Sequence, residues 1–188
     1  MDAFSYLSVL LSIILGLALT QLLQGLRGIA LHRARVVSWW PVLTWTGILM
    51  LVFVQSWWAM FGLRQHTGWV FVQFFTVILH TVLLYMLAAL VLPDITGKET
   101  TDLRAHYFAQ RRLFMLTLLA TAGVSVLKDV VIDGRLPTFP NLGFHLGYLA
   151  AATIGLLTAR EWYHKFLAVG LAVVFSLYIL LLFSRLAG

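Results

Sequence analysis

The 188-residue sequence contains no cysteine and few charged residues. The absence of cysteine excludes disulfide bridges, thiol catalysis and Cys-ligated zinc or iron–sulfur sites. Charged residues make up only 11% of the chain and apolar residues 61%. Soluble globular proteins carry about a quarter charged residues, so this composition is typical of a chain that is surrounded by lipid.

Acidic residues are missing from the middle of every long apolar run, and no His-Glu-x-x-His motif occurs. Both absences argue against a carboxylate proton relay, an intramembrane aspartyl protease and a zinc protease of that type. Ser125 and Lys128 follow the order of a Ser-x-x-Lys nucleophile pair, but this match is only two residues long. We therefore expect a protein that is not an enzyme, and we assign no catalytic or metal-binding residue.

What the chain does contain is a series of long apolar runs, with a mean hydropathy of +0.93 overall. They lie near residues 4–27, 40–63, 69–92, 113–132, 139–159 and 163–185. Each is close to the ~20 residues that cross a bilayer as a helix. Pro41 fits the first turn of the second run and Pro93 ends the third, while Thr101 is expected to cap a helical lead-in to the fourth. The sequence predicts an all-α polytopic membrane protein, a single domain over residues 1–188 formed by a bundle of six transmembrane helices.

The basic residues are distributed unequally between the two ends of these runs. One end has nine: Arg27, Arg33, Arg35, Lys98, Arg104, Arg111, Arg112, Arg160 and Lys165. The other has four: Arg64, Lys128, Arg135 and Arg185. Because cytoplasmic loops carry the excess of Lys and Arg, we expect both termini outside, in the inner (plasma) membrane of a bacterium. The net charge of +6 then reflects topology and attraction to anionic lipid headgroups at the inner rim, and no nucleic-acid partner is expected.

The first apolar run has a small and polar stripe along its whole length. At 100° per residue, one sector contains Asp2, Ser5, Ser8, Ser12, Gly16, Thr20, Gln24 and Arg27, opposite Leu10, Ile14, Leu17 and Leu22. We expect lipid to contact the leucine face and the other helices to gather around the polar face.

Other polar residues share both a helix face and a depth in the outer half of the bundle. The predicted ligand-binding residues are His80, His145, Gln73, Thr76, Tyr148, Asn141, Lys128, Ser8, Ser12 and Gln55. Such residues often only hydrogen-bond a neighbouring helix. His80 is the most informative of them, because an ionisable group near the membrane centre is costly and is usually functional. With no acid near the middle of a span, we expect an anionic or neutral ligand.

Three classes of function follow, in order of preference. The first is a transporter or channel with a polar site in the outer half for a small neutral or anionic solute or ion. The second is a non-catalytic membrane subunit or scaffold. The third is a redox subunit that binds haem b or a quinone, although His80 and His145 differ in depth by about six residues, or ~9 Å along a helix.

The last apolar run has no polar stripe, only a row of small residues formed by Ala168, Ala172 and Ser176. Small residues allow two helix backbones to approach closely. The row therefore predicts a homo-oligomer with this helix at the interface.

Overall fold

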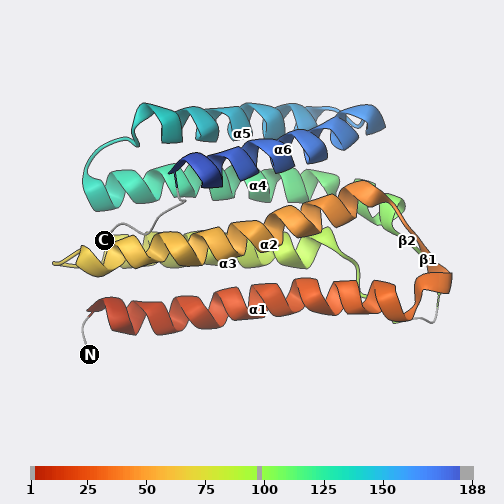
Figure 1. Cartoon of the computed structure of the whole chain (residues 1–188), viewed down its shortest axis with the longest axis horizontal. Helices are drawn as coiled ribbons and strands as arrows, with labels where there is room; N and C mark the ends of the chain where they lie inside the picture. The colour runs from red at the N-terminus through yellow and green to blue at the C-terminus, as the bar shows by residue number, and fades with distance from the viewer. Residues whose placement is uncertain (1–2, 97–98, 183–188) are drawn as a thin grey trace.

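The computed structural model describes residues 3–96 and 99–182, which form six long helices arranged side by side (Figure 1). In chain order the elements are α1 (Ala3–Leu31), η1 (Arg33–Arg35), β1 (Val36–Val37), α2 (Trp40–Met60), η2 (Phe61–Gln65), α3 (Phe71–Val91), β2 (Thr101–Asp102), α4 (Leu103–Asp133), α5 (Phe139–Leu157) and α6 (Glu161–Leu182). The expected all-helical architecture is present. The residues Asp2, Lys98 and Arg185, which entered the sequence argument, lie outside the described residues.

Five of these helices are long and apolar enough to cross a membrane. The candidate spans are Phe4–Leu31, Trp40–Gln65, Phe71–Val91, Leu103–Asp133 and Glu161–Leu181. The remaining helix, α5, has 19 residues and is not among the five. Its first half contains Pro140, Asn141 and His145, which lower its hydropathy.

The helix ends follow local sequence signals. Pro41 occupies the first turn of α2, where a missing N–H costs nothing. Asp102, and not Thr101, caps α4, because its Oδ1 accepts hydrogen bonds from the backbone N–H groups of Arg104 and Ala105 at 2.8 and 3.1 Å. Gly134 ends α4 with a φ of 69°, a left-handed conformation that glycine adopts without steric cost.

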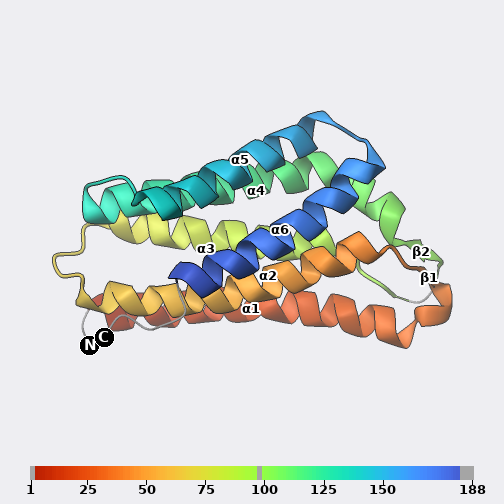
Figure 2. The same ribbon diagram turned by 45° about the horizontal axis from the view of Figure 1, so that its top comes forward.

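Five of the helices form a closed ring and α1 lies outside it. Around the ring, α2 contacts α3, α3 contacts α4, α4 contacts α5, α5 contacts α6, and α6 returns to α2. Helix α1 packs mainly on α3, with a smaller contact to α2, and lies at the edge of the bundle in both views (Figures 1 and 2). The expectation that the other helices gather around α1 is therefore wrong.

The face of α1 that packs is also not the expected one. Its buried residues are Leu7, Leu11, Leu15, Ala18, Leu22 and Gly28, whereas Gly16, Thr20 and Gln24 of the polar stripe are exposed. Since lipid tails are as apolar as leucine, helices in a membrane associate by close packing and not by hiding apolar surface. The interlocking leucines of α1 provide that packing, and the hydroxyl of Thr20 is satisfied by the carbonyl of Gly16 at 2.8 Å.

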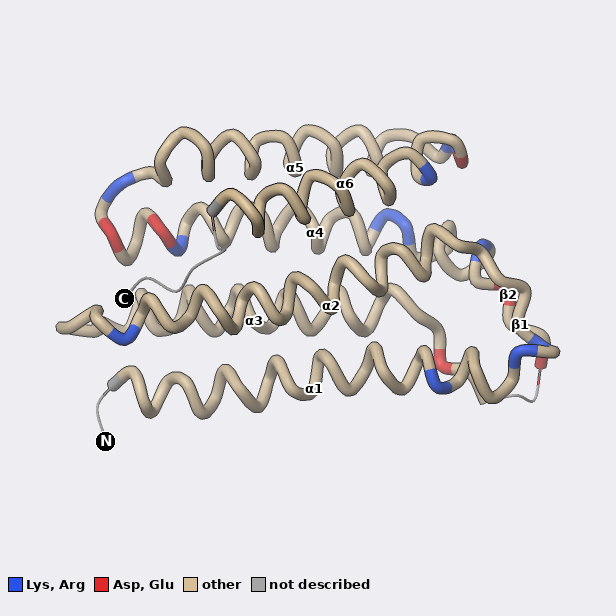
Figure 3. Tube along the Cα trace, in the orientation of Figure 1, with Lys and Arg blue, Asp and Glu red and all other residues tan. Residues whose placement is uncertain are grey.

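Charged residues lie at the two ends of the bundle and are unequally shared between them (Figure 3). Helix α1 begins and α6 ends at the same end, which we call the terminal end. The opposite end, which we call the basic end, contains eight described basic residues: Arg27, Arg33, Arg35, Arg104, Arg111, Arg112, Arg160 and Lys165. The terminal end has Arg64, Lys128 and Arg135 among the described residues.

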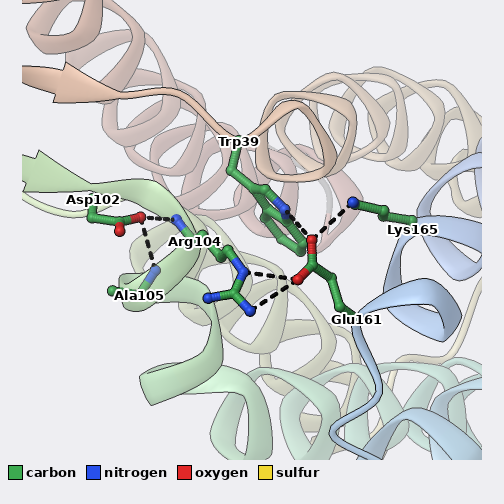
Figure 4. A network of polar contacts seen from close by, with 6 residues as sticks. All are labelled: Trp39, Asp102, Arg104, Ala105, Glu161 and Lys165. Carbon is green, nitrogen blue, oxygen red and sulfur yellow. Dashed lines mark hydrogen bonds and ion pairs between the residues drawn. The ribbon is translucent and has the colours of Figure 1, made fainter.

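Two sets of polar contacts hold the basic end together. Val36 and Val37 pair in parallel with Thr101 and Asp102, which joins the α1–α2 connection to the segment before α4. Figure 4 shows Glu161 at the start of α6 in contact with Arg104, Lys165 and Trp39: the Arg104 and Lys165 nitrogens lie 2.9 and 2.8 Å from its oxygens, and Trp39 Nε1 donates at 3.4 Å.

Beneath this surface, buried polar side chains fix the start of α6 against α4. Tyr107 donates its hydroxyl hydrogen to Nδ1 of His164 over 2.9 Å, and Nε2 of His164 donates to the carbonyl of Thr158 at 3.0 Å. The Tyr107 ring is buried among Trp39, Phe108 and Phe114. Between α4 and α6, the basic end of the bundle is thus filled by side chains.

Candidate ligand-binding cavity

The ring of five helices encloses a cavity of about 410 Å³ in the half of the bundle nearer the terminal end. Helices α2 to α6 and the 3-10 turn η2 all contribute to its wall, and none of the described residues of α1 does. The lining extends from exposed Gly62 and Asp133 at the helix ends to fully buried residues such as Trp45 and Leu84. The cavity therefore reaches the surface at the terminal end and stops inside the bundle.

One wall carries a connected set of hydrogen bonds between α4, α5 and α6. Asn141 is its centre: its Oδ1 accepts a hydrogen bond of 3.0 Å from the Tyr178 hydroxyl, and its Nδ2 lies 3.5 Å from Asp129 Oδ2. The backbone carbonyl of Asn141 accepts from His145 Nδ1 at 2.9 Å, and His145 Nε2 lies 3.1 Å from Ser125 Oγ. These contacts hold the three helices in register along the cavity.

The charges at the mouth are two carboxylates and one lysine. Lys128 Nζ lies 3.7 Å from Asp129 Oδ1, and Asp133 also lines the cavity. Both carboxylates sit in the last turns of α4, near the terminal end. The expectation of an anionic or neutral ligand rested on the lack of an acid near the middle of a span, and the two carboxylates at the mouth do not favour an anion.

The floor of the cavity is apolar. It is formed by Trp45, Ile48, Leu49, Leu84, Leu87, Leu118 and Leu171, most of which belong to the main hydrophobic core of the chain. Polar groups at the mouth and aliphatic groups at the floor make the cavity amphipathic along its depth.

Several polar side chains of the cavity lining make no hydrogen bond within the described residues. The hydroxyl oxygen of Tyr148 is buried and has none. The indole Nε1 of Trp45 is also buried without a partner, and the half-buried His80 makes no hydrogen bond within the described chain. Buried polar groups are normally hydrogen-bonded, so the Tyr148 hydroxyl and Trp45 Nε1, together with the His80 ring, are available to a molecule inside the cavity.

Six of the ten predicted ligand-binding residues line this cavity: His80, His145, Tyr148, Asn141, Lys128 and Gln55. The structure thus brings together the residues of α2 to α5 that were selected for sharing a face and a depth. Ligand binding by them stays a prediction.

Gln73 and Thr76 do not line the cavity. Gln73 instead joins α3 to the end of α4, because its Nε2 donates to the carbonyl of Val131 at 3.2 Å while its Oε1 accepts from the N–H of Val70. The hydroxyl of Thr76 donates to the carbonyl of Val72 at 2.7 Å. Both residues have structural partners within the described chain.

Ser8 and Ser12 also lie outside the cavity, because α1 lies outside the ring. The hydroxyl of Ser8 donates to the carbonyl of Ser5 at 2.9 Å, and that of Ser12 to the carbonyl of Ser8 at 2.5 Å. The angular arithmetic located these residues on one face of α1 but could not tell which helix that face meets.

Sequence reasoning missed Ser125, Asp129, Asp133 and Tyr178 as residues of the site. Ser125 shares a helical face with Thr117, Thr121 and Lys128, which was a usable signal. Tyr178 had none, because α6 shows no polar stripe and a lone tyrosine in an apolar run is unremarkable.

A bis-histidine haem does not fit the site as it stands. Such a haem needs a free ring nitrogen from each of two histidines, whereas both ring nitrogens of His145 are engaged, by Asn141 and by Ser125. Among residues 3–96 and 99–182, no group of three or more His, Asp or Glu side chains is placed to hold a metal ion.

The row of small residues on α6 faces the chain's own interior over part of its length. Ala168 is fully buried and Ala172 packs against the core, while Ser176 is exposed. Ala168 is therefore not available to a second copy. The predicted homo-oligomer stays a prediction, and only the Ser176 end of the row could contribute to it.

Comparisons with models of protein families, with curated proteins and with solved structures found no match for this chain.

Proposed function

We propose that this chain is a membrane carrier that binds a small amphiphilic molecule in the cavity at its terminal end. One observation carries the proposal: the same cavity has hydrogen-bonding side chains at its mouth and aliphatic side chains at its floor. A molecule with a polar head and a short apolar part satisfies both. The unpartnered Tyr148 hydroxyl and the His80 ring supply the contacts to the head.

The cavity opens at one end of the bundle only, which favours a carrier over a protein that only binds its ligand. The cavity reaches the terminal end, while buried side chains and the contacts of Glu161 and Arg104 close the ring between α4 and α6 at the basic end. A carrier that alternates access has one state that is open to only one membrane face. If the chain is instead a scaffold without a ligand, the same cavity has no specific occupant.

The membrane arrangement belongs to the same proposal. Helix α5 is proposed as a sixth span, because it lies alongside α4 and α6 (Figure 1) and its polar residues face the cavity wall instead of lipid. The larger number of basic residues at the basic end (Figure 3) favours that end in the cytoplasm. Both termini are then outside, in the inner membrane of a bacterium.

The charges at the mouth select the ligand class. Two carboxylates, Asp129 and Asp133, face one ammonium group, Lys128. A negatively charged head would meet a net negative charge, so the ligand is proposed to be neutral or cationic. A ligand with an anionic head is disfavoured by like-charge repulsion in a partly desolvated site.

The test uses three six-carbon probes that differ in head charge: hexyltrimethylammonium, hexanamide and hexanoate. Each is titrated into the full chain in lipid nanodiscs, and binding is followed by tryptophan fluorescence and thermal shift. The cation and the amide should bind saturably and the anion weakly. Leu84→Trp, which fills the floor, should abolish binding, whereas Leu10→Trp on the exposed face of α1 should not.

His80→Ala should weaken hexyltrimethylammonium or hexanamide binding by about fivefold, the equivalent of roughly 1 kcal/mol for one hydrogen bond. Gln73→Leu is the matched control, since Gln73 joins helices but does not line the cavity. Uptake of labelled hexyltrimethylammonium into proteoliposomes then separates a carrier from a binding protein. Binding that Leu84→Trp leaves unchanged would reject the proposal.

A further inference from the structure

Ser125 directs its hydroxyl differently from the other helical hydroxyls near it. In this chain Ser8, Thr46, Thr81 and Thr117 each bond a carbonyl three or four residues earlier in their own helix, which is the usual arrangement. Thr121, one turn before Ser125 and also on the cavity wall, bonds the carbonyl of Thr117 at 2.7 Å. The hydroxyl of Ser125 instead lies 3.1 Å from a ring nitrogen of His145 on α5.

The tautomer of His145 gives this contact a direction. Its Nδ1 lies 2.9 Å from the carbonyl oxygen of Asn141, and a carbonyl oxygen only accepts hydrogen bonds. Nδ1 therefore carries the hydrogen. In the neutral imidazole Nε2 is then an acceptor, so the hydroxyl of Ser125 donates to Nε2. His145 is buried, and the bond to Asn141 fixes its ring orientation.

A serine hydroxyl that donates to an oriented imidazole is the arrangement of a base-activated nucleophile. Here a backbone carbonyl orients the histidine in the position that a carboxylate often occupies. Both residues line the cavity, and so does Tyr148, whose buried hydroxyl has no partner within the described chain. Tyr148 follows His145 by three residues on α5, on the same side of the helix.

We propose that the cavity hydrolyses carboxylic esters, with Ser125 as nucleophile, His145 as general base and acid, and Tyr148 as a hydrogen-bond donor to the oxyanion. This inference rests on the proposed function in one respect, because the apolar part of the ester occupies the same floor as the amphiphile. It adds a reaction that ligand binding alone does not require.

The reaction proceeds in two balanced halves. Ser125 Oγ attacks the carbonyl carbon while its proton passes to His145 Nε2; the C–O bond to the alcohol then breaks, and the departing alcohol takes that proton. Water next adds to the acyl carbon of the acyl-serine and gives a proton to Nε2. The bond between the acyl carbon and Oγ breaks as Oγ recovers the proton. Ester and water become acid and alcohol, with no redox change.

The test is covalent labelling of the full chain in nanodiscs by a fluorophosphonate, which reacts with activated serine hydroxyls, and location of the adduct by peptide mass spectrometry. Wild-type protein should be labelled at Ser125, and Ser125→Ala should not be labelled. His145→Gln should slow labelling by about a hundredfold or more, the usual contribution of a general base.

Thr121→Ala is the matched control, because Thr121 lines the same cavity but its hydroxyl is engaged by its own helix; its labelling should equal that of wild type. Hydrolysis of 4-nitrophenyl hexanoate should follow the same order of variants.

The inference is overturned if the wild-type chain carries no adduct at Ser125, or if His145→Gln leaves the labelling rate unchanged. Saturable hexyltrimethylammonium binding in such a chain would leave the carrier proposal standing, and a labelled chain without that binding would reject the carrier proposal instead.

Discussion

The guanidinium of Arg111 on α4 donates from Nη1 to the carbonyl oxygen of Gly155 at the end of α5, at 2.9 Å. The same nitrogen lies 3.1 Å from the carbonyl oxygen of Leu156 and also contacts that of Thr158. The last carbonyls of a helix have no partner inside it, and the negative end of the helix dipole favours a cation there. Arg111, which is buried, therefore satisfies the end of α5.

Replacing Arg111 by Met should lower the free energy of unfolding by about 2 kcal/mol, because charged hydrogen bonds are lost and buried carbonyls are left without donors. The neighbouring Arg112 is exposed, so Arg112→Met is the matched control and should change stability little. Thermal unfolding in detergent, followed by circular dichroism, measures both. Equal melting temperatures for the two variants would contradict this role of Arg111.

Gly25 allows α1 to approach the end of α3 closely. A β-carbon at this position would lie 2.6 Å from Leu92 Cδ1 and 3.0 Å from Leu92 Cβ. Gly25→Ala should therefore destabilise the fold by about 1–2 kcal/mol through overpacking. Gly16 on the same helix has nothing within 4 Å of its added β-carbon, and Gly16→Ala should stabilise α1 by up to ~1 kcal/mol through helix propensity. A thermal shift of the same sign in both variants would count against the close contact.

The orientation can be tested with fusions of alkaline phosphatase, which folds only outside, and of green fluorescent protein, which fluoresces only inside. A phosphatase joined after α6 should be active and a fluorescent protein there dark. Fusions after Thr96, at the basic end, should give the reverse pattern, because basic loops stay in the cytoplasm. The opposite pair of results would place the cavity mouth on the cytoplasmic side.

The apolar runs of the sequence predicted the positions of the helices, because their lengths match the thickness of a bilayer and Pro41 and Pro93 lie at helix ends. The sequence could not predict which face of α1 is buried. In a membrane both apolar and small polar faces can meet lipid, so the shape of Leu7, Leu11 and Leu15 decided the packing.

The candidate site was predictable where several helices offered polar residues at one depth, as with His80, Asn141 and His145. It was not predictable for Ser8, Ser12 and Gln73, because periodicity assigns a residue to a face but not to a neighbouring helix. The hydrogen bond between Ser125 and His145 joins α4 to α5. Helical periodicity relates residues within one helix, so it could not predict this contact between two helices.

The ring of helices determines when the cavity can form as the helices emerge in chain order. Helix α1 precedes its main partner α3 in the chain, so until α3 has emerged α1 has only its smaller contact with α2. The ring closes only where α6 meets α2, and Phe175 and Tyr178 of α6 belong to the cavity wall. The cavity wall is therefore complete only once α6 is in place, and a chain that ends before α6 lacks this side of the site.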